Sequence, residues 1–293
     1  MKIAKRVLLF VSVNLLIVLT LSITLSLLGF APYLSQKGID FYQLMAFCLI
    51  WGFGGAFISL AISRQMAKWM MGVELIPDDT RDHSRRQLRD RVHTFARQAG
   101  LTVMPEVGVY DSPEINAFAT GPTKNRSLVA VSTGLLNQMN ANEVDGVLAH
   151  EVAHIANGDM VTMTLVQGVV NALVMFLARV AAYFASQLVD EEKRPLVQMG
   201  ATLALEIILG ILGMLVVSYV SRQREFRADA GGARLAGRDS MIVALEKLKT
   251  TLHSEDDHPS LATLKISSRS GGFAQLFSTH PDLDLRIARL KGP

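Results

Sequence analysis

The stretch NANEVDGVLAHEVAHIANGDM, residues 140–160, predicts the helix around which the fold is organised. Asn140 followed by Glu143 is a capping-box start, and Asn157-Gly158 is typical of a helix that ends in the left-handed conformation. Apolar residues recur at helical spacing and predict one buried face, formed by Val144, Val147, Leu148, Val152 and Ile155.

This helix contains the pattern H-E-x-x-H, formed by His150, Glu151 and His154. Histidines four residues apart project from the same helix face and can bind one ion. We expect one Zn²⁺ per chain, because neutral imidazole is a good zinc ligand. Glu151 can face the water bound to that ion and is the candidate general base. The alternative is an accidental pattern of helix polar groups, which seven histidines in 293 residues make improbable.

The composition argues against a fully soluble protein, because 50% of the residues are hydrophobic. The single cysteine, Cys48, excludes an internal disulfide and is expected to be a buried thiol. The net charge is only +3, and the basic residues cluster at the ends of apolar runs. They indicate orientation in a membrane and no nucleic-acid partner.

Residues 1–63 are predicted to form an N-terminal transmembrane hairpin, with helices over 7–30 and 41–62, both free of charged residues. A cleaved signal peptide is the alternative for the first run, but the run is long and no cleavage site follows it. Basic residues flank both ends of the hairpin: Lys2, Lys5, Arg6, Arg64 and Lys68. The positive-inside rule therefore places the N-terminus and the chain after residue 63 in the cytoplasm.

Residues 64–159 are predicted to form a cytoplasmic part that holds the H-E-x-x-H helix. Three β-rich pieces, 106–110, 115–120 and 127–132, predict a small sheet beside that helix. An edge strand next to a metal site can pair with an extended peptide, as proteolysis requires. Asn116 is a candidate substrate-binding residue; alternatively, its side chain bonds its own turn.

Residues 160–220 are predicted to form a second transmembrane hairpin, over about 160–189 and 196–220; whether it crosses the bilayer fully is left open. Each run carries one charge, Arg179 or Glu206. Because the two residues are equally far from the connecting loop, we expect them to form an ion pair or to share one polar pocket between the two helices. The hairpin also returns the chain to the membrane face where His154 lies.

Residues 221–293 are predicted to form a cytoplasmic part with the third zinc ligand and C-terminal helices. Glu225 and Asp229 lie four residues apart, on one helix face. Glu225 is the expected ligand, and Asp229 is expected to orient a ligand histidine by accepting its other ring N–H. The alternative is a solvated helix beside the membrane. His280 precedes a helix predicted to start at Pro281; it is a candidate for oxyanion contact, or simply a residue of the helix start.

Several motifs together resemble the HtpX family of bacterial membrane zinc peptidases, relatives of the CAAX-processing prenyl proteases: Asn-Ala-Phe-Ala-Thr-Gly, His-Glu-Val-Ala-His-Ile-Ala-Asn-Gly-Asp, Arg-Glu-Phe-Arg-Ala-Asp-Ala and Thr-His-Pro. The resemblance implies a zinc endopeptidase of the bacterial cytoplasmic (inner) membrane, with its termini and active site cytoplasmic. It also implies quality control of damaged or misassembled membrane proteins under stress. The family commonly has His where this chain has Arg227, a position that is not an expected ligand.

The expected fold is thus an α-helical integral membrane protein with four transmembrane helices and a cytoplasmic α+β zinc-protease domain of the gluzincin-like type. Its expected partners are the lipid bilayer and unfolded or misassembled protein substrates. Two alternative functions remain: a membrane peptide-binding or chaperone-like protein with a structural zinc, and a protease that processes lipidated C-termini.

Overall fold

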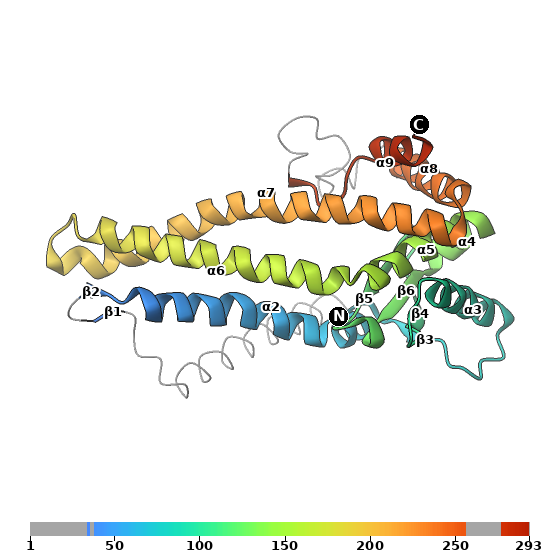
Figure 1. The fold of residues 1–293 in the computed structure, drawn as a ribbon, viewed down its shortest axis with the longest axis horizontal. Coiled ribbons are helices and arrows are strands. Elements are labelled where there is room, and N and C mark those ends of the chain that lie inside the picture. The colour runs from blue at the N-terminus through green and yellow to red at the C-terminus, as the bar shows by residue number, and fades with distance from the viewer. Residues whose placement is uncertain (1–33, 36–37, 256–276, 293) are drawn as a thin grey trace. The chain divides into compact units, whose positions relative to one another are not determined.

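The computed structural model describes residues 34–35, 38–255 and 277–292 (Figure 1). The first predicted span, 7–30, lies outside the described residues. The chain divides into two compact units. One comprises residues 1–59 and 163–217, and is called the helical unit below. The other comprises residues 60–162 and 218–293, and is called the site unit.

The helical unit is formed by parts of three long helices, α2 (Phe41–Met71), α6 (Asp159–Ser186) and α7 (Arg194–Ala236), and contains the short strands β1 (Leu34–Ser35) and β2 (Gly38–Ile39). Among the described residues these three helices are long and apolar enough to cross a membrane, α7 together with the turn η2 (Glu191–Lys193) before it. The described part of the chain is therefore mostly helical and contains three candidate membrane helices. Helix α7 continues past residue 220, where the predicted span ends, to Ala236, and so carries Glu225 and Asp229.

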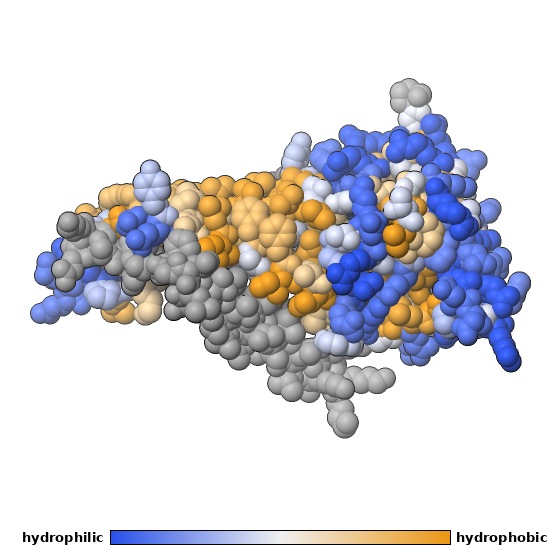
Figure 2. All heavy atoms as spheres, turned by 60° about the horizontal axis from the view of Figure 1, so that its bottom comes forward, coloured by the Kyte–Doolittle hydropathy of each residue, from blue (hydrophilic) through white to orange (hydrophobic). Residues whose placement is uncertain are grey.

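Polar and small residues fix the packing inside the helical unit. A side chain at Gly52 of α2 would lie 2.7 Å from the backbone nitrogen of Ala172 of α6, so these helices approach closely. Arg179 of α6 binds Glu206 of α7 at 2.5 Å, which confirms the predicted ion pair. Cys48 is fully buried, as expected. Large apolar side chains remain exposed along the three helices (Figure 2), as suits a surface facing lipid.

The site unit contains a four-stranded sheet of β3 (Glu74–Leu75), β4 (Glu106–Tyr110), β5 (Ala117–Thr120) and β6 (Leu128–Ser132). The strand order is β3-β4-β6-β5, with β4 and β6 parallel and the other pairs antiparallel. The predicted small sheet is confirmed. Strand β3 was not predicted, because two residues leave no alternating pattern to detect.

Helices α3 (His83–Gln98) and α5 (Ala141–Asn157) pack on one face of this sheet, with Val92, Val129 and Val152 fully buried between them. The turn η1 (Lys124–Arg126) precedes β6, and α4 (Thr133–Gln138) follows it. The predicted ends of α5 are confirmed by the capping box of Asn140 and Glu143 and by Gly158, whose φ is 72°.

The C-terminal helices α8 (Arg238–Glu255) and α9 (Leu283–Lys291) pack together through an apolar cluster of Met241, Leu245, Ile287 and Leu290. The predicted start of α9 at Pro281 is wrong by two residues. The Asp282 side chain accepts hydrogen bonds from the backbone nitrogens of Asp284 and Leu285, so Asp282 caps a helix that begins at Leu283.

Candidate metal centre

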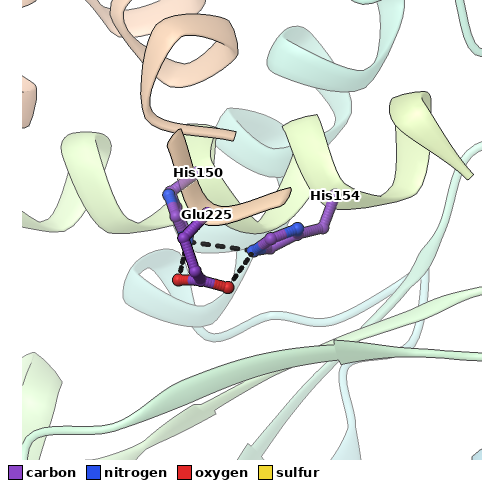
Figure 3. Close-up of side chains that lie close together, drawn as sticks. All are labelled: His150, His154 and Glu225. Atoms are coloured by element: carbon purple, nitrogen blue, oxygen red, sulfur yellow. Dashed lines mark hydrogen bonds and ion pairs between the residues drawn. The ribbon is translucent and has the colours of Figure 1, made fainter. Parts of the chain in front are cut away.

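Two imidazoles of α5 and one carboxylate of α7 converge in the site unit (Figure 3). Nε2 of His154 lies 3.0 Å from Nε2 of His150 and 3.4 Å from Oε1 of Glu225. Nε2 of His150 lies 3.5 Å from Oε2 of Glu225. All three side chains are buried, Glu225 most completely, with 1% of its surface exposed. The described chain thus brings together the three residues expected to bind the metal.

The spacing of these atoms fits a zinc ion. Tetrahedral zinc with bonds of 2.0–2.1 Å separates its ligand atoms by about 3.3 Å, which matches the observed 3.0 to 3.5 Å. Two nitrogens and one carboxylate oxygen form the donor set of a catalytic site that leaves a position for water or substrate. His150, His154 and Glu225 therefore fit the metal that the pattern predicts.

A carboxylate lies beside the far nitrogen of each histidine. Nδ1 of His150 lies 3.0 Å from Oδ1 of Asp229, and Nδ1 of His154 hydrogen-bonds Oδ2 of Asp159 at 2.6 Å. A carboxylate that accepts a hydrogen bond from Nδ1, as Asp159 does from His154, keeps the proton on Nδ1 and leaves the Nε2 lone pair for a metal. Asp229 thus lies beside His150, and its role in orienting this histidine stays a prediction.

The same carboxylates control the charge of the two imidazoles in the metal-free protein. Burial lowers the pKa of His150, but Asp229 and Glu225 outweigh this effect and raise the pKa above its ordinary value. Burial also lowers the pKa of His154, and Asp159 and Glu225 raise it to about 9. The site is thus negative enough to hold a bound cation, whether protons or a metal ion.

Two arginines contact the carboxylates of Asp229 and Glu225. Arg286 of α9, which is buried, binds Asp229 through Nε at 2.8 Å and Nη2 at 2.6 Å, and its Nη1 lies 3.6 Å from Glu225. Arg224 contributes Nη2 at 3.3 Å from Oε1 of Glu225. These contacts connect the C-terminal helix to the histidines through Asp229 and Glu225.

Small residues allow α7 to reach α5. A side chain at Gly231 would lie 2.7 Å from Cβ of Ala153, and one at Gly232 would lie 3.1 Å from the backbone nitrogen of His150. The pair of glycines therefore permits the close contact that brings Glu225 and Asp229 to the histidines.

The sequence also predicted three site residues that are not metal ligands: Glu151, His280 and Asn116. Among the described residues, Glu151 has no hydrogen-bond or ion-pair partner. His280 reaches the site, but through Nδ1, which lies 3.0 Å from Oε2 of Glu225. Asn116 precedes β5, where its backbone pairs with Ser132: its nitrogen donates to Oγ at 3.1 Å, and its oxygen accepts from the backbone nitrogen at 2.9 Å.

Sequence reasoning missed Asp159, Arg224 and Arg286. Asp159 follows the helix stop Asn157-Gly158, so its position five residues after His154 was a usable signal. Arg224 is next to Glu225 in the chain, but it belongs to a basic stretch that is typical of a solvated helix face. Arg286 is 57 residues from Asp229, and no sequence signal linked them.

An H-E-x-x-H helix completed by a carboxylate from a second helix defines the class of metallopeptidases. Residues 82–293 match the model of Peptidase family M48, and the chain belongs to this family. It is 54% identical to the "Protease HtpX homolog" of Bacillus subtilis, over 98% of this chain and 99% of that one. It is 50% identical to "Protease HtpX" of Thioalkalivibrio sulfidiphilus, over 98% of both chains.

The fold is similar to the crystal structure of S. mikatae Ste24p, with a TM-score of 0.60 and 20% sequence identity. The similarity covers 95% of this chain and 65% of that one. The family match and the identity of 50–54% to proteins named HtpX confirm the resemblance to the HtpX family, and the chain is a metalloprotease. Its family implies a metal, generally zinc, and the apolar helices suggest an integral membrane protein.

Proposed function

We propose that this metalloprotease is a zinc-dependent endopeptidase of the bacterial cytoplasmic membrane, which cleaves damaged or misassembled membrane proteins on the cytoplasmic side. The observation that carries the proposal is the convergence of His150, His154 and Glu225, whose possible metal-ligating atoms all lie within 4.8 Å of one another. In this proposal these three residues are the zinc ligands, and Asp229 orients His150. Family membership disfavours the alternative of a binding protein with a structural zinc.

Bound zinc would supply an acidified water and a Lewis acid for the scissile carbonyl. Glu151, on the same helix as both histidines and without a partner among the described residues, accepts the proton of the attacking water. It then returns that proton to the leaving amine. In this proposal the exposed ring of His280 would contact the developing oxyanion.

An extended substrate would bind at β5. This strand is at an edge of the four-stranded sheet and packs on α5, which carries Glu151. A free strand edge recognises the peptide backbone and accepts many sequences, as degradation of unfolded proteins requires. The amide of Asn116, next to β5, would hold the substrate backbone.

The membrane arrangement is part of the same proposal. Residues 1–63 and 160–220 would form two transmembrane hairpins, and residues 64–159 and 221–293 the cytoplasmic part. The basic residues Arg64 and Lys68, near the end of α2, support this orientation by the positive-inside rule.

The test compares the detergent-solubilised wild type with Glu151→Gln on an unfolded membrane-protein substrate, with zinc measured in both. We expect Glu151→Gln to retain one zinc per chain and to lose turnover by a factor of about 100 or more. Cleavage by Glu151→Gln at the wild-type rate would exclude Glu151 as the base. A wild type whose cleavage is unaffected by zinc chelation would contradict the proposed function itself.

A further inference from the structure

Residues 277–280 run along one face of α7, beside the candidate metal centre. Oγ of Ser218 donates to the carbonyl of Phe277 at 3.0 Å, and Nη1 of Arg222 donates to the carbonyl of Ser278 at 2.8 Å. Nδ1 of His280 then lies 3.0 Å from Oε2 of Glu225. We call residues 277–280 the strap.

The three α7 residues that contact the strap lie on one face of the helix. Ser218, Arg222 and Glu225 are separated by four and three residues, so they follow one another along a single helix face. Two of them bind main-chain carbonyls, and the third contacts the imidazole. The strap is thus fixed to α7 mainly through its backbone, and the ring of His280 is delivered to Glu225 as a result.

The other end of the strap is fixed as well. Oγ of Ser278 donates to the carbonyl of His280 at 2.6 Å, which closes a tight turn. Pro281 restricts the backbone of His280, which precedes it, and Asp282 caps α9. These contacts leave the backbone of His280 little freedom and so hold its ring at a defined position.

The environment of His280 suits a group that meets a substrate. Its side chain is 65% exposed, although it touches Glu225, of which 1% is exposed. One ring nitrogen is therefore used on the buried carboxylate while the ring stays accessible from outside. The ring of His280 therefore connects the buried carboxylate of Glu225 to the solvent-accessible surface.

We propose that Arg222 is a positioning residue, which holds the Ser278 carbonyl and thereby keeps His280 where it reaches both Glu225 and a bound substrate. The proposal rests on the proposed peptidase function and deepens it. Arg222 is half-buried, and its charged donor makes a stronger bond to the carbonyl than a neutral donor would. It acts on the reaction through His280.

The experiment uses the full-length protein in detergent with its zinc. Arg222→Met removes the donor and keeps the length of the side chain, whereas Arg222→Lys restores a donor. Arg227→Met is the matched control, because Arg227 is an exposed arginine of the same helix. We expect Arg222→Met to lower kcat roughly 10- to 100-fold, as misplacement of a reacting group does. KM should change less than about twofold, and Arg222→Lys should recover most of the loss.

A double-mutant cycle and a measurement of exchange separate positioning from folding. In a His280→Ala background, Arg222→Met should cause no further loss of kcat. Amide hydrogen exchange of the peptide 277–286 should accelerate in Arg222→Met and not in Arg227→Met, with zinc content unchanged in both. Additive losses, unchanged exchange, or loss of zinc in Arg222→Met would each overturn the proposal. A fully active His280→Ala would also overturn it and leave the peptidase function standing, whereas zinc-independent cleavage would contradict the function.

Discussion

Arg286 binds Asp229 through two parallel hydrogen bonds, of 2.8 Å from Nε and 2.6 Å from Nη2, although the residues are 57 positions apart. Both side chains are buried, and Asp229 in turn lies 3.0 Å from Nδ1 of His150. The C-terminal helix α9 therefore helps to fix the orientation of a candidate metal ligand on α5. This relationship links the stability of the site unit to its affinity for metal.

Replacement of Arg286 by Met should lower both the stability of the site unit and its affinity for zinc. Removal of one partner of a buried ion pair leaves the other charge unpaired and costs about 3–5 kcal/mol. Loss of a carboxylate's orientation weakens metal binding roughly 10- to 100-fold. Denaturant unfolding of the metal-free protein and zinc competition measure the two effects. Arg289→Met is the control, because Arg289 is an exposed arginine of the same helix, whose Cζ lies 3.9 Å from the ring centroid of Phe226. Equal behaviour of the two variants would contradict the role of Arg286.

Asp159 should matter for zinc affinity through His154, whose Nδ1 it binds at 2.6 Å. Asp159→Asn keeps an oxygen acceptor and loses the charge, whereas Asp159→Ala loses both. We expect zinc affinity to fall in the order wild type, Asn, Ala, with the Ala variant roughly 10- to 100-fold weaker than the wild type. Competition with a zinc chelator at fixed pH gives these affinities. If Asp159→Ala bound zinc with wild-type affinity, the contact of Asp159 with His154 would not contribute to zinc binding.

The metal-free site unit should lose stability as the pH rises. The folded pKa of His154, about 9, lies above its ordinary value of 6.5, because Asp159 and Glu225 favour the protonated ring. Its contribution to stability is therefore fully present below pH 6.5 and is lost as the pH rises through about 9. Zinc affinity should rise over the same range, because bound protons are displaced by the metal. Unfolding and zinc titrations at intervals from pH 6 to 10 test both slopes, and a zinc affinity that does not change with pH would contradict the prediction.

The ion pair of Arg179 and Glu206 should stabilise the helical unit as a pair. Either single neutralisation, Arg179→Met or Glu206→Gln, leaves an unpaired charge among apolar helices and should lower the unfolding temperature markedly. The double variant should lose less than the two single losses combined. Thermal unfolding in detergent measures all three variants. If Arg179→Met has no effect while Glu206→Gln abolishes folding and activity, the pairing is not what stabilises this part of the chain.

Local sequence signals were sufficient for the helix that carries the histidines. The spacing of Asn140 and Glu143, the apolar face and Gly158 each specify a helix end or face without help from the rest of the chain. Arg179 and Glu206 are equally far from the loop that connects their helices. Their contact was predictable, because such residues lie side by side in a hairpin of two antiparallel helices. The same geometry predicted that Glu225 would return to His154.

Contacts that depend on packing could not be predicted in this way. Arg286 has the appearance of an ordinary surface residue until α9 packs on α8, and only then does it reach Asp229. The strand β3 forms because β4 offers it a partner, which its two residues do not reveal. The start of α9 was misplaced because Pro281 and Asp282 are both good start signals, and only the observed hydrogen bonds distinguish them.

The central claim is that Glu225, delivered by α7, completes a metal site begun by His150 and His154. The most direct test is the zinc content of purified Glu225→Ala, with Glu151→Gln as the reference variant. We predict that Glu225→Ala holds far less than one zinc per chain after dialysis, while Glu151→Gln holds one. A Glu225→Ala protein that retains one zinc per chain with wild-type affinity would contradict the claim.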